Sequence, residues 1–127
     1  MDLISKIKEQ ARKHKQRIVL PEGTESRTLA AADIILKEGL AEIILIGNPD
    51  EIKDEATRLN LEHIGKATII DPLNNPKEEE YVAMLVEIRK SKGLTVEKAR
   101  ELLKDPLYLA VIMIKNGDAD GEVAGAD

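Results

Sequence analysis

The residues that could carry chemistry gather in a short polar turn, residues 23–27, between an apolar segment and a helical pattern. The turn offers backbone N–H groups at the start of a predicted helix. The hydroxyls of Thr24 and Ser26 and the guanidinium of Arg27 are close in sequence, and this combination suits a phosphate or a carboxylate. The alternative is an ordinary strand-to-helix turn in which Ser26 caps the helix and Arg27 lies in solvent. The spacing matches neither a Walker A loop nor G-x-G-x-x-G.

A second cationic segment ends a later predicted helix. Arg89, Lys90 and Lys92 could together hold a polyphosphate. Cations also favour helix C-termini without any ligand, because they interact with the negative end of the helix macrodipole. On the residues alone, this second interpretation is favoured.

The remaining polar residues give no catalytic unit. Asp118, Asp120 and Glu122 hint at a calcium loop but lack the spacing of an EF-hand, so no metal site is predicted. His14 and His63 are far apart in sequence and have no paired carboxylate. The chain has no cysteine, which excludes a disulfide, a thiol nucleophile and a cysteine-held metal. The sequence therefore predicts binding chemistry without a catalytic residue, a metal or a cofactor.

Composition excludes several classes of protein and partner. The 127 residues fit one domain, and the apolar and charged fractions of 43% and 34% are typical of a folded, water-soluble chain. Only 2% of the residues are aromatic, which argues against a stacking surface for single-stranded nucleic acid. No apolar run approaches a membrane span, and no signal peptide is visible. We therefore expect a cytoplasmic protein with no nucleic-acid and no membrane partner.

The net charge of −5 is unevenly distributed, since residues 1–17 are basic and the rest of the chain is acidic. A basic N-terminal helix could be a nucleic-acid arm, a transit peptide or a solvated face. Asp2 and Glu9 fit a transit peptide poorly, and the helix leads directly into a strand. The charge pattern favours the solvated face.

Hydrophobic spacing predicts strands that alternate with helices. The predicted strands cover residues 18–20, 43–46, 67–70 and 121–124. The predicted helices extend from residue 3 to 15, between the caps Ser26 and Gly39, from Pro49 to Leu59, from Pro76 to Gly93, from Thr95 to Leu103 and from Leu107 to Lys115. A strand is the alternative for the last of these segments. The alternation predicts a three-layer αβα architecture with a mostly parallel sheet and helices on both faces.

Two of these helices carry predictions about burial. In the helix after Pro76, the residues predicted to face the core are Tyr81, Met84, Leu85 and Ile88. The segment 107–115 is apolar almost all round, which predicts burial on most of its sides.

All four predicted strands send their following loops to one edge of the sheet. Those loops are residues 21–26, 47–48, 71–75 and 125–127. Open α/β sheets bind ligands outside the carboxyl ends of their strands, so we expect any ligand at this edge. Only a loop follows the last predicted strand, and this predicts an incomplete domain.

Four segments, agreeing in order and spacing along essentially the whole chain, resemble the phosphate acetyl/butyryl transferase family. They are R-I-V-L-P-E-G-T-E-S-R-T-L-A-A-A at 17–32, G-L-A-E-I-I-L-I-G-N at 39–48, E-I-R-K-S-K-G-L-T at 87–95 and G-D-A-D-G-E-V-A-G-A at 117–126. The resemblance implies acyl transfer between coenzyme A and inorganic phosphate, which gives acetyl phosphate and free coenzyme A. Coenzyme A is then a substrate rather than a resident cofactor.

The resemblance also implies how the chain relates to a whole enzyme. Family members are two-domain α/β enzymes, commonly dimers, with the site in the cleft between the domains, and they are well over twice as long as this chain. Residues 1–127 are then the N-terminal part of the first domain, and a homodimer is expected at full length. The family's catalytic serine, arginine and aspartate belong to a C-terminal segment outside this sequence.

One position of the family's binding site carries over to this chain. Arg89 matches an arginine implicated in binding coenzyme A, and Arg27 matches a recurrent arginine after the P-E turn. With Thr24 and Ser26 they are the predicted substrate-binding residues. Many members have V-S-G-A where this chain has V-A-G-A, so that Ala124 lacks a hydroxyl. With the missing segment, this predicts that the isolated chain is inactive.

Two alternatives stay open at this point. One is the related transferase-like region of a larger multidomain protein, such as a malic enzyme. The other is a free-standing, non-catalytic module that binds an anion or a nucleotide.

Overall fold

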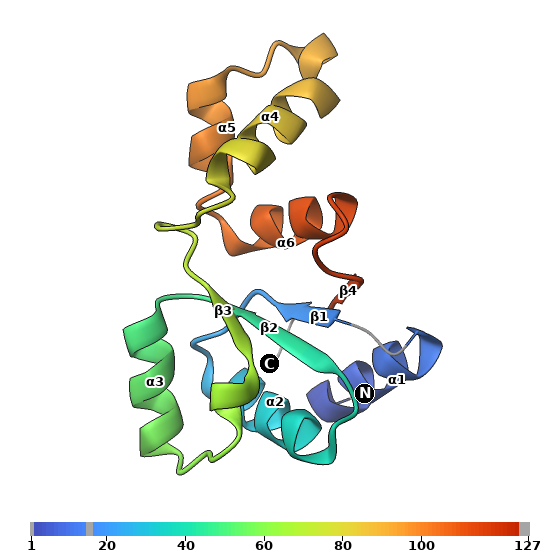
Figure 1. Ribbon diagram of the computed structural model, residues 1–127, viewed down its shortest axis with the longest axis vertical. Helices are drawn as coiled ribbons and strands as arrows, with labels where there is room; N and C mark the ends of the chain where they lie inside the picture. The colour runs from blue at the N-terminus through green and yellow to red at the C-terminus, as the bar shows by residue number, and fades with distance from the viewer. Residues whose placement is uncertain (1, 15–16, 125–127) are drawn as a thin grey trace.

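The computed structural model describes residues 2–14 and 17–124 and contains one parallel sheet (Figure 1). Its strands are β1 (Arg17–Leu20), β2 (Glu42–Ile46), β3 (Thr68–Ile70) and β4 (Gly121–Glu122), in the order β3-β2-β1-β4. In the register, Ile18 lies between Ile43 and Gly121. The predicted strands are confirmed, except that the last is shorter than predicted. Residues 125–127, predicted as the fourth loop, lie outside the described residues.

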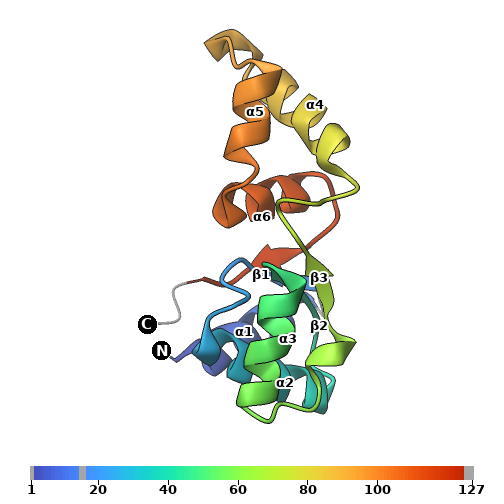
Figure 2. The ribbon, with the colours of Figure 1, turned by 90° about the vertical axis from the view of Figure 1, so that its left-hand side faces the viewer.

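Helices cover both faces of the sheet, so the predicted three-layer αβα architecture is confirmed (Figures 1 and 2). One face packs against α1 (Leu3–His14), α2 (Ser26–Glu38) and α3 (Pro49–Arg58). The other face packs against α6 (Pro106–Lys115), so the segment predicted as a helix or a strand is a helix. Each core is built from the alternate residues of the strands, as the two-residue period of a strand requires.

Two further helices form a lobe that projects beyond α6, away from the sheet (Figures 1 and 2). They are α4 (Glu78–Ile88) and α5 (Val96–Leu102), which pack on each other. The short 3-10 turn η2 (Lys90–Lys92) joins them at the tip, and another, η1 (Ile64–Lys66), precedes β3. We call α4, η2 and α5 the helical lobe. Among the described residues, no helix combines the length and the apolar character needed to cross a membrane.

Local signals explain most helix boundaries. Asn48 caps α3 by accepting hydrogen bonds from two backbone N–H groups, with Pro49 at the first helical position, as predicted. Thr95 caps α5, and Gly39 ends α2 with a left-handed φ of 65°. The predicted start of α4 at Pro76 is wrong. Asn75 instead closes a separate turn on Lys77, and α4 begins at Glu78.

The burial predictions for α4 and α6 are only partly right. Tyr81 and Leu85 are buried as predicted, but Ile88 is 49% exposed, because it lies at the lobe tip beyond any neighbouring layer. Along α6, Leu107 is 50% exposed and Val111 is 44% exposed. The helix packs against the sheet on one side and the lobe on another, which leaves a third side uncovered.

Candidate functional site

The strand order places a topological switch point between β1 and β4, because the chain builds β1, β2 and β3 outward in one direction and then returns to the other side of β1. Ligands of open α/β sheets bind outside the carboxyl ends of the strands at such a point. A hollow of about 350 Å³ lies there, between the loop after β1, the start of α6 and the end of β4. Its lining residues are Pro21, Glu22, Asp105, Pro106, Leu107 and Ala124.

The polar turn beside this hollow is fixed by close backbone contacts. The N–H of Gly23 donates to the carbonyl of Ile46 at 3.1 Å, which ties the turn to the end of β2. A Cβ atom on Gly23 would lie 2.5 Å from that carbonyl oxygen, so only glycine fits without movement. Gly47 donates in turn to Ile70 at 3.0 Å. The polar turn is therefore held against the end of β2, and the loop after β2 is held against the end of β3.

The prediction that Ser26 caps α2 is wrong, because the cap is Glu25. One carboxylate oxygen of Glu25, Oε2, accepts from the Thr28 N–H at 2.8 Å and from the Thr28 hydroxyl at 3.1 Å. The other, Oε1, accepts from Nε of Arg27 at 3.2 Å. Burial pushes the pKa of Glu25 upward, but the hydrogen bonds from Thr28 and Arg27 outweigh burial and hold the pKa below its usual value.

This capping changes what the turn can offer an anion. The Glu25 carboxylate already occupies the positive end of α2, so the free backbone N–H groups expected there are not all free. The groups left for a ligand are the exposed Thr24 and Arg27 side chains and the half-buried Ser26. All three belong to the segment that joins the carboxyl end of β1 to the first turn of α2.

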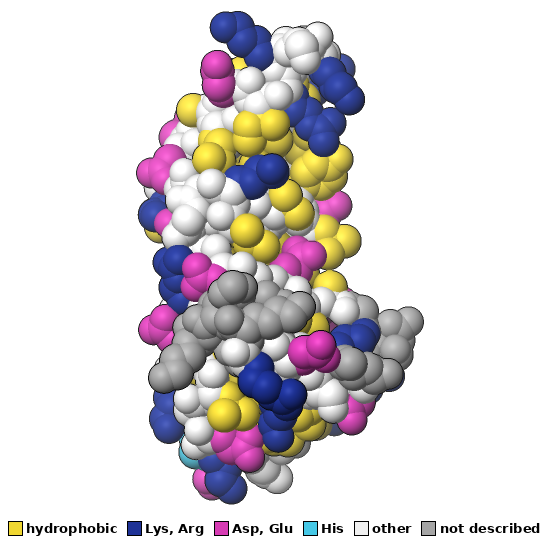
Figure 3. All heavy atoms as spheres, turned by 90° about the vertical axis from the view of Figure 1, so that its right-hand side faces the viewer, with side chains coloured by type: hydrophobic (Ala, Val, Ile, Leu, Met, Phe, Trp, Pro, Cys, Tyr) yellow, Lys and Arg dark blue, Asp and Glu magenta, His cyan; other side chains and the backbone are white. Residues whose placement is uncertain are grey.

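Arg89 lies elsewhere, at the junction of α4 and η2 on the tip of the helical lobe (Figure 1). It is half-buried, and its backbone N–H donates to the Leu85 carbonyl at 3.0 Å. Figure 3 shows Lys and Arg side chains at this end of the molecule. Lys90 and Lys92, both exposed, belong to η2. The structure therefore does not place Arg89 beside Arg27.

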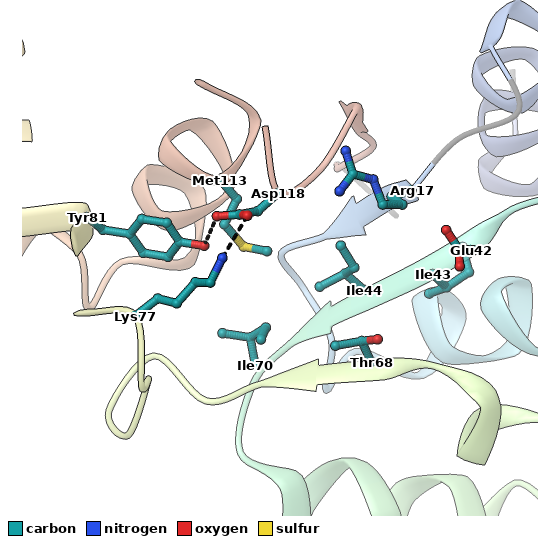
Figure 4. A pocket seen from close by; sticks show the side chains of 10 residues that line it. All are labelled: Arg17, Glu42, Ile43, Ile44, Thr68, Ile70, Lys77, Tyr81, Met113 and Asp118. Atoms are coloured by element: carbon teal, nitrogen blue, oxygen red, sulfur yellow. Dashed lines mark hydrogen bonds and ion pairs between the residues drawn. The ribbon is translucent and has the colours of Figure 1, made fainter. Parts of the chain in front are cut away.

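A second hollow, of about 260 Å³, opens between the sheet and the helices on its α6 face (Figure 4). At one end Asp118 accepts from the Tyr81 hydroxyl at 2.6 Å and from Lys77 Nζ at 2.8 Å. Asn116 also donates to this carboxylate, at 2.8 Å. Sequence analysis missed this cluster, because its members come from α4, α6 and their flanking loops.

The pKa values in this cluster reflect the same contacts. Burial pushes the pKa of Asp118 upward, but the hydrogen bonds from Asn116, Lys77 and Tyr81 outweigh burial and lower the pKa to about 2. Burial and the hydrogen bond to Asp118 raise the pKa of Tyr81. The cluster is therefore an internally satisfied junction between the lobe and the approach to β4.

Asp120 and Glu122, the other two acids of this segment, have different surroundings. Asp120 forms two hydrogen bonds with the Arg17 side chain, at 3.0 and 3.1 Å. Glu122 pairs with Val19 across the sheet, and its buried Oε2 has no hydrogen-bond partner in the described part of the chain. Burial raises the pKa of Glu122. Among the side chains that the structure describes, no three from His, Asp or Glu are placed to hold a metal ion.

The two histidines take no part in either hollow as far as the structure describes them. The backbone N–H of His63 donates to Asp33 at 2.7 Å, and the side chain is half-buried. The side chain of His14 lies outside what the structure describes.

Comparison with known proteins identifies the family of this chain. The sequence profile described as phosphate acetyl/butaryl transferase matches residues 2–127. The chain belongs to this family. The resemblance found in the four motifs is therefore confirmed, and the curated relatives named below are enzymes.

Curated relatives carry the name phosphate acetyltransferase. The protein from Thermoanaerobacterium thermosaccharolyticum is 52% identical over 126 residues, which are 99% of this chain and 38% of the relative's length. That from Clostridium acetobutylicum is 50% identical over 126 residues, with the same coverage of 99% and 38%. The chain thus spans little more than a third of these relatives.

Solved structures of the family share the fold. A phosphotransacetylase from Streptococcus pyogenes has a TM-score of 0.84 and 35% identity, and the match covers 98% of this chain and 37% of that one. The EutD phosphotransacetylase from Staphylococcus aureus has a TM-score of 0.84 and 30% identity, covering 100% of this chain and 39% of that one.

Proposed function

We propose that the full-length polypeptide carrying this chain transfers an acetyl group between coenzyme A and inorganic phosphate. In the forward direction a phosphate oxygen attacks the thioester carbonyl carbon of acetyl-CoA. The bond from that carbon to sulfur breaks, and the thiolate takes up a proton to give free coenzyme A and acetyl phosphate. The observation that carries the proposal is the identity of about half of all residues with phosphate acetyltransferases along nearly the entire chain.

The carboxyl edge of the sheet supports a binding role for this part of the polypeptide. Both substrates are anions, and Arg27, Thr24 and Ser26 supply a guanidinium and two hydroxyls just after Pro21 and Glu22, which line the switch-point hollow. Such groups bind a phosphate through charge-assisted hydrogen bonds. We assign these three residues to the binding of a substrate phosphate group.

Arg89 is assigned to a different part of the same reaction. The phosphates of coenzyme A lie at the opposite end of that long molecule from its thiol. A cation remote from the hollow, at the tip of the helical lobe, can therefore contact the coenzyme without touching the reacting thioester. We propose that Arg89 binds a coenzyme A phosphate.

We further propose that residues 1–127 form the first part of the first α/β domain of a homodimeric enzyme. The switch-point hollow is bounded on the described side by acids, prolines and aliphatic residues. The groups that stabilise the oxyanion and protonate the leaving thiolate then come from the rest of the polypeptide.

The activity is tested by incubating the full-length protein with acetyl phosphate and coenzyme A and measuring formation of the thioester. Turnover that requires both substrates is expected. A folded protein that forms no thioester with these substrates would overturn the proposed reaction.

The test of Arg89 is Arg89→Gln in that protein. Loss of a charge-assisted hydrogen bond should raise the KM for coenzyme A by about tenfold or more, with the KM for phosphate unchanged. Arg100→Gln is the control within the same lobe, since Arg100 pairs with Glu79 and should affect neither KM. An unchanged KM for coenzyme A in Arg89→Gln would remove this assignment.

A further inference from the structure

Glu25 divides its carboxylate between two tasks. Oε2 receives both hydrogen bonds from Thr28 and so holds the first turn of α2. Oε1 is left for the Arg27 side chain, which it meets at Nε at 3.2 Å. The carboxylate that fixes the helix start is therefore also the group that fixes the direction of the neighbouring guanidinium.

The contact uses only one edge of that guanidinium. Within residues 2–14 and 17–124, no hydrogen bond joins either Nη group of Arg27 to another residue, and its side chain is 62% exposed. A guanidinium held through Nε keeps its two Nη groups available as a fork for a phosphate or a carboxylate. Arg27 is also the single cation among residues 21–27.

Anchoring matters because a free arginine side chain samples many rotamers. Ordering it when a ligand binds reduces affinity, and a contact that orders it beforehand removes that cost. Glu25 is itself well fixed, since its side chain is only 29% exposed and is tied to Thr28. A neighbour that moved freely could not orient Arg27 in this way.

From this geometry we infer that Glu25 is a positioning residue, which orients the Arg27 guanidinium toward the phosphate group of a substrate. The inference rests on the proposed function of Arg27. Glu25 does not touch the substrate, and its negative charge is compensated by the Thr28 N–H and by Arg27 itself. The opposing possibility is that Glu25 masks Arg27 and weakens binding, which the same experiment distinguishes.

The decisive variant is Glu25→Gln in the full-length protein. The amide oxygen of glutamine can still accept from Thr28 and keep the cap, whereas its NH₂ group cannot accept from Nε of Arg27. We expect KM to rise by about two- to tenfold for one substrate, either phosphate or coenzyme A, with the thermal midpoint little changed. The affected substrate should be the same one for which Arg27→Gln raises KM.

Two control variants separate positioning from general damage. Thr28→Val removes one hydrogen bond of the cap but leaves the contact between Glu25 and Arg27, so KM should stay the same. Glu55→Gln breaks a similar exposed pair with Arg58 on α3, and it should also leave KM unchanged.

The outcomes are distinct. If Arg27→Gln changes neither KM, the assignment of Arg27 fails, and the inference about Glu25 fails with it. If Arg27→Gln raises a KM but Glu25→Gln does not, only the positioning role is overturned. A lower KM in Glu25→Gln would show masking instead. The double variant should be no worse than Arg27→Gln alone, because Glu25 acts through Arg27.

Discussion

At the scale of single residues, Asp118 shows how one carboxylate can tie together elements that are distant in sequence. It lies in the turn that precedes β4 and binds Tyr81 and Lys77, which are 37 and 41 residues away. Tyr81 is only 2% exposed, so its hydroxyl depends on this partner. A buried hydroxyl that loses its acceptor carries a desolvation cost that no other contact offsets.

The lowered pKa of Asp118 predicts how the free energy of unfolding depends on pH. Because the pKa of Asp118 falls from 3.8 to about 2 on folding, the ionised carboxylate contributes roughly 2 kcal/mol to the free energy of unfolding. The contribution is complete above about pH 4 and is lost as the pH falls toward 2. Asp118→Asn should therefore destabilise the full-length protein near neutral pH and much less in acid.

The measurement is urea denaturation of both proteins across this pH range. Asp54→Asn, at an exposed position on α3, is the control, and it should change the free energy of unfolding little. A difference for Asp118→Asn that is the same at acid and neutral pH would contradict the role assigned to the ionised carboxylate.

At the scale of secondary-structure elements, the turn after β1 depends on one close approach. A methyl group on residue 23 would meet the Ile46 carbonyl at 2.5 Å, and neither backbone can move without disturbing the sheet. We expect Gly23→Ala to lower the free energy of unfolding by about 1–3 kcal/mol, the usual range for forced overpacking. It should also raise the KM of the substrate bound by Arg27, because the whole turn shifts.

Gly65→Ala is the matched control for this substitution, since no described residue other than its chain neighbours has an atom within 4 Å of the added Cβ. Urea denaturation and the acetyl-transfer assay of both variants give the comparison. Equal stability of Gly23→Ala and Gly65→Ala would show that the turn adapts more easily than the close contact implies.

The elements also show which features of the fold were predictable from the sequence. The start of α3 at Pro49, the start of α5 after Thr95 and the apolar runs of β1 and β2 are local patterns, and the structure confirms them. The choice of Glu25 over Ser26 as a cap was not predictable, because it depends on where the turn leaves β1. The cluster at Asp118 was not predictable either, because Lys77 and Tyr81 at the start of α4 meet Asp118 after α6 only in the folded chain.

The candidate site was predictable to a similar degree. The carboxyl edge follows from strands that alternate with helices, and the switch-point hollow lies there. The distance between Arg27 and Arg89 does not follow from any local pattern, because it depends on the helical lobe projecting away from the sheet (Figure 2). Two arginines that the sequence offers as candidate substrate-binding residues therefore lie far apart, one at the start of α2 and one at the tip of the helical lobe.

At the scale of the whole molecule, residues 1–127 cover only 38% of a curated relative and leave apolar surface uncovered. Within the described residues, β4 has a hydrogen-bonded neighbour on one side only, namely β1. Leu107 and Val111, one helical turn apart on α6, are about half exposed. An unpaired strand edge and an apolar patch both favour association between copies.

We therefore expect residues 1–127, produced alone, to self-associate in a concentration-dependent manner and to show no acetyl transfer. Light scattering with size-exclusion chromatography measures the self-association, and the thioester assay measures acetyl transfer. Replacing Leu107 and Val111 by lysine should shift the population toward monomer, because charge on the exposed side of α6 opposes its burial. Leu73→Lys, at a loop position that is 74% exposed, removes a comparable apolar side chain elsewhere and should leave association unchanged. A monodisperse, cooperatively folding monomer would instead mean that these residues form an independent unit. If that monomer also transferred acetyl groups, the catalytic groups would lie within this chain.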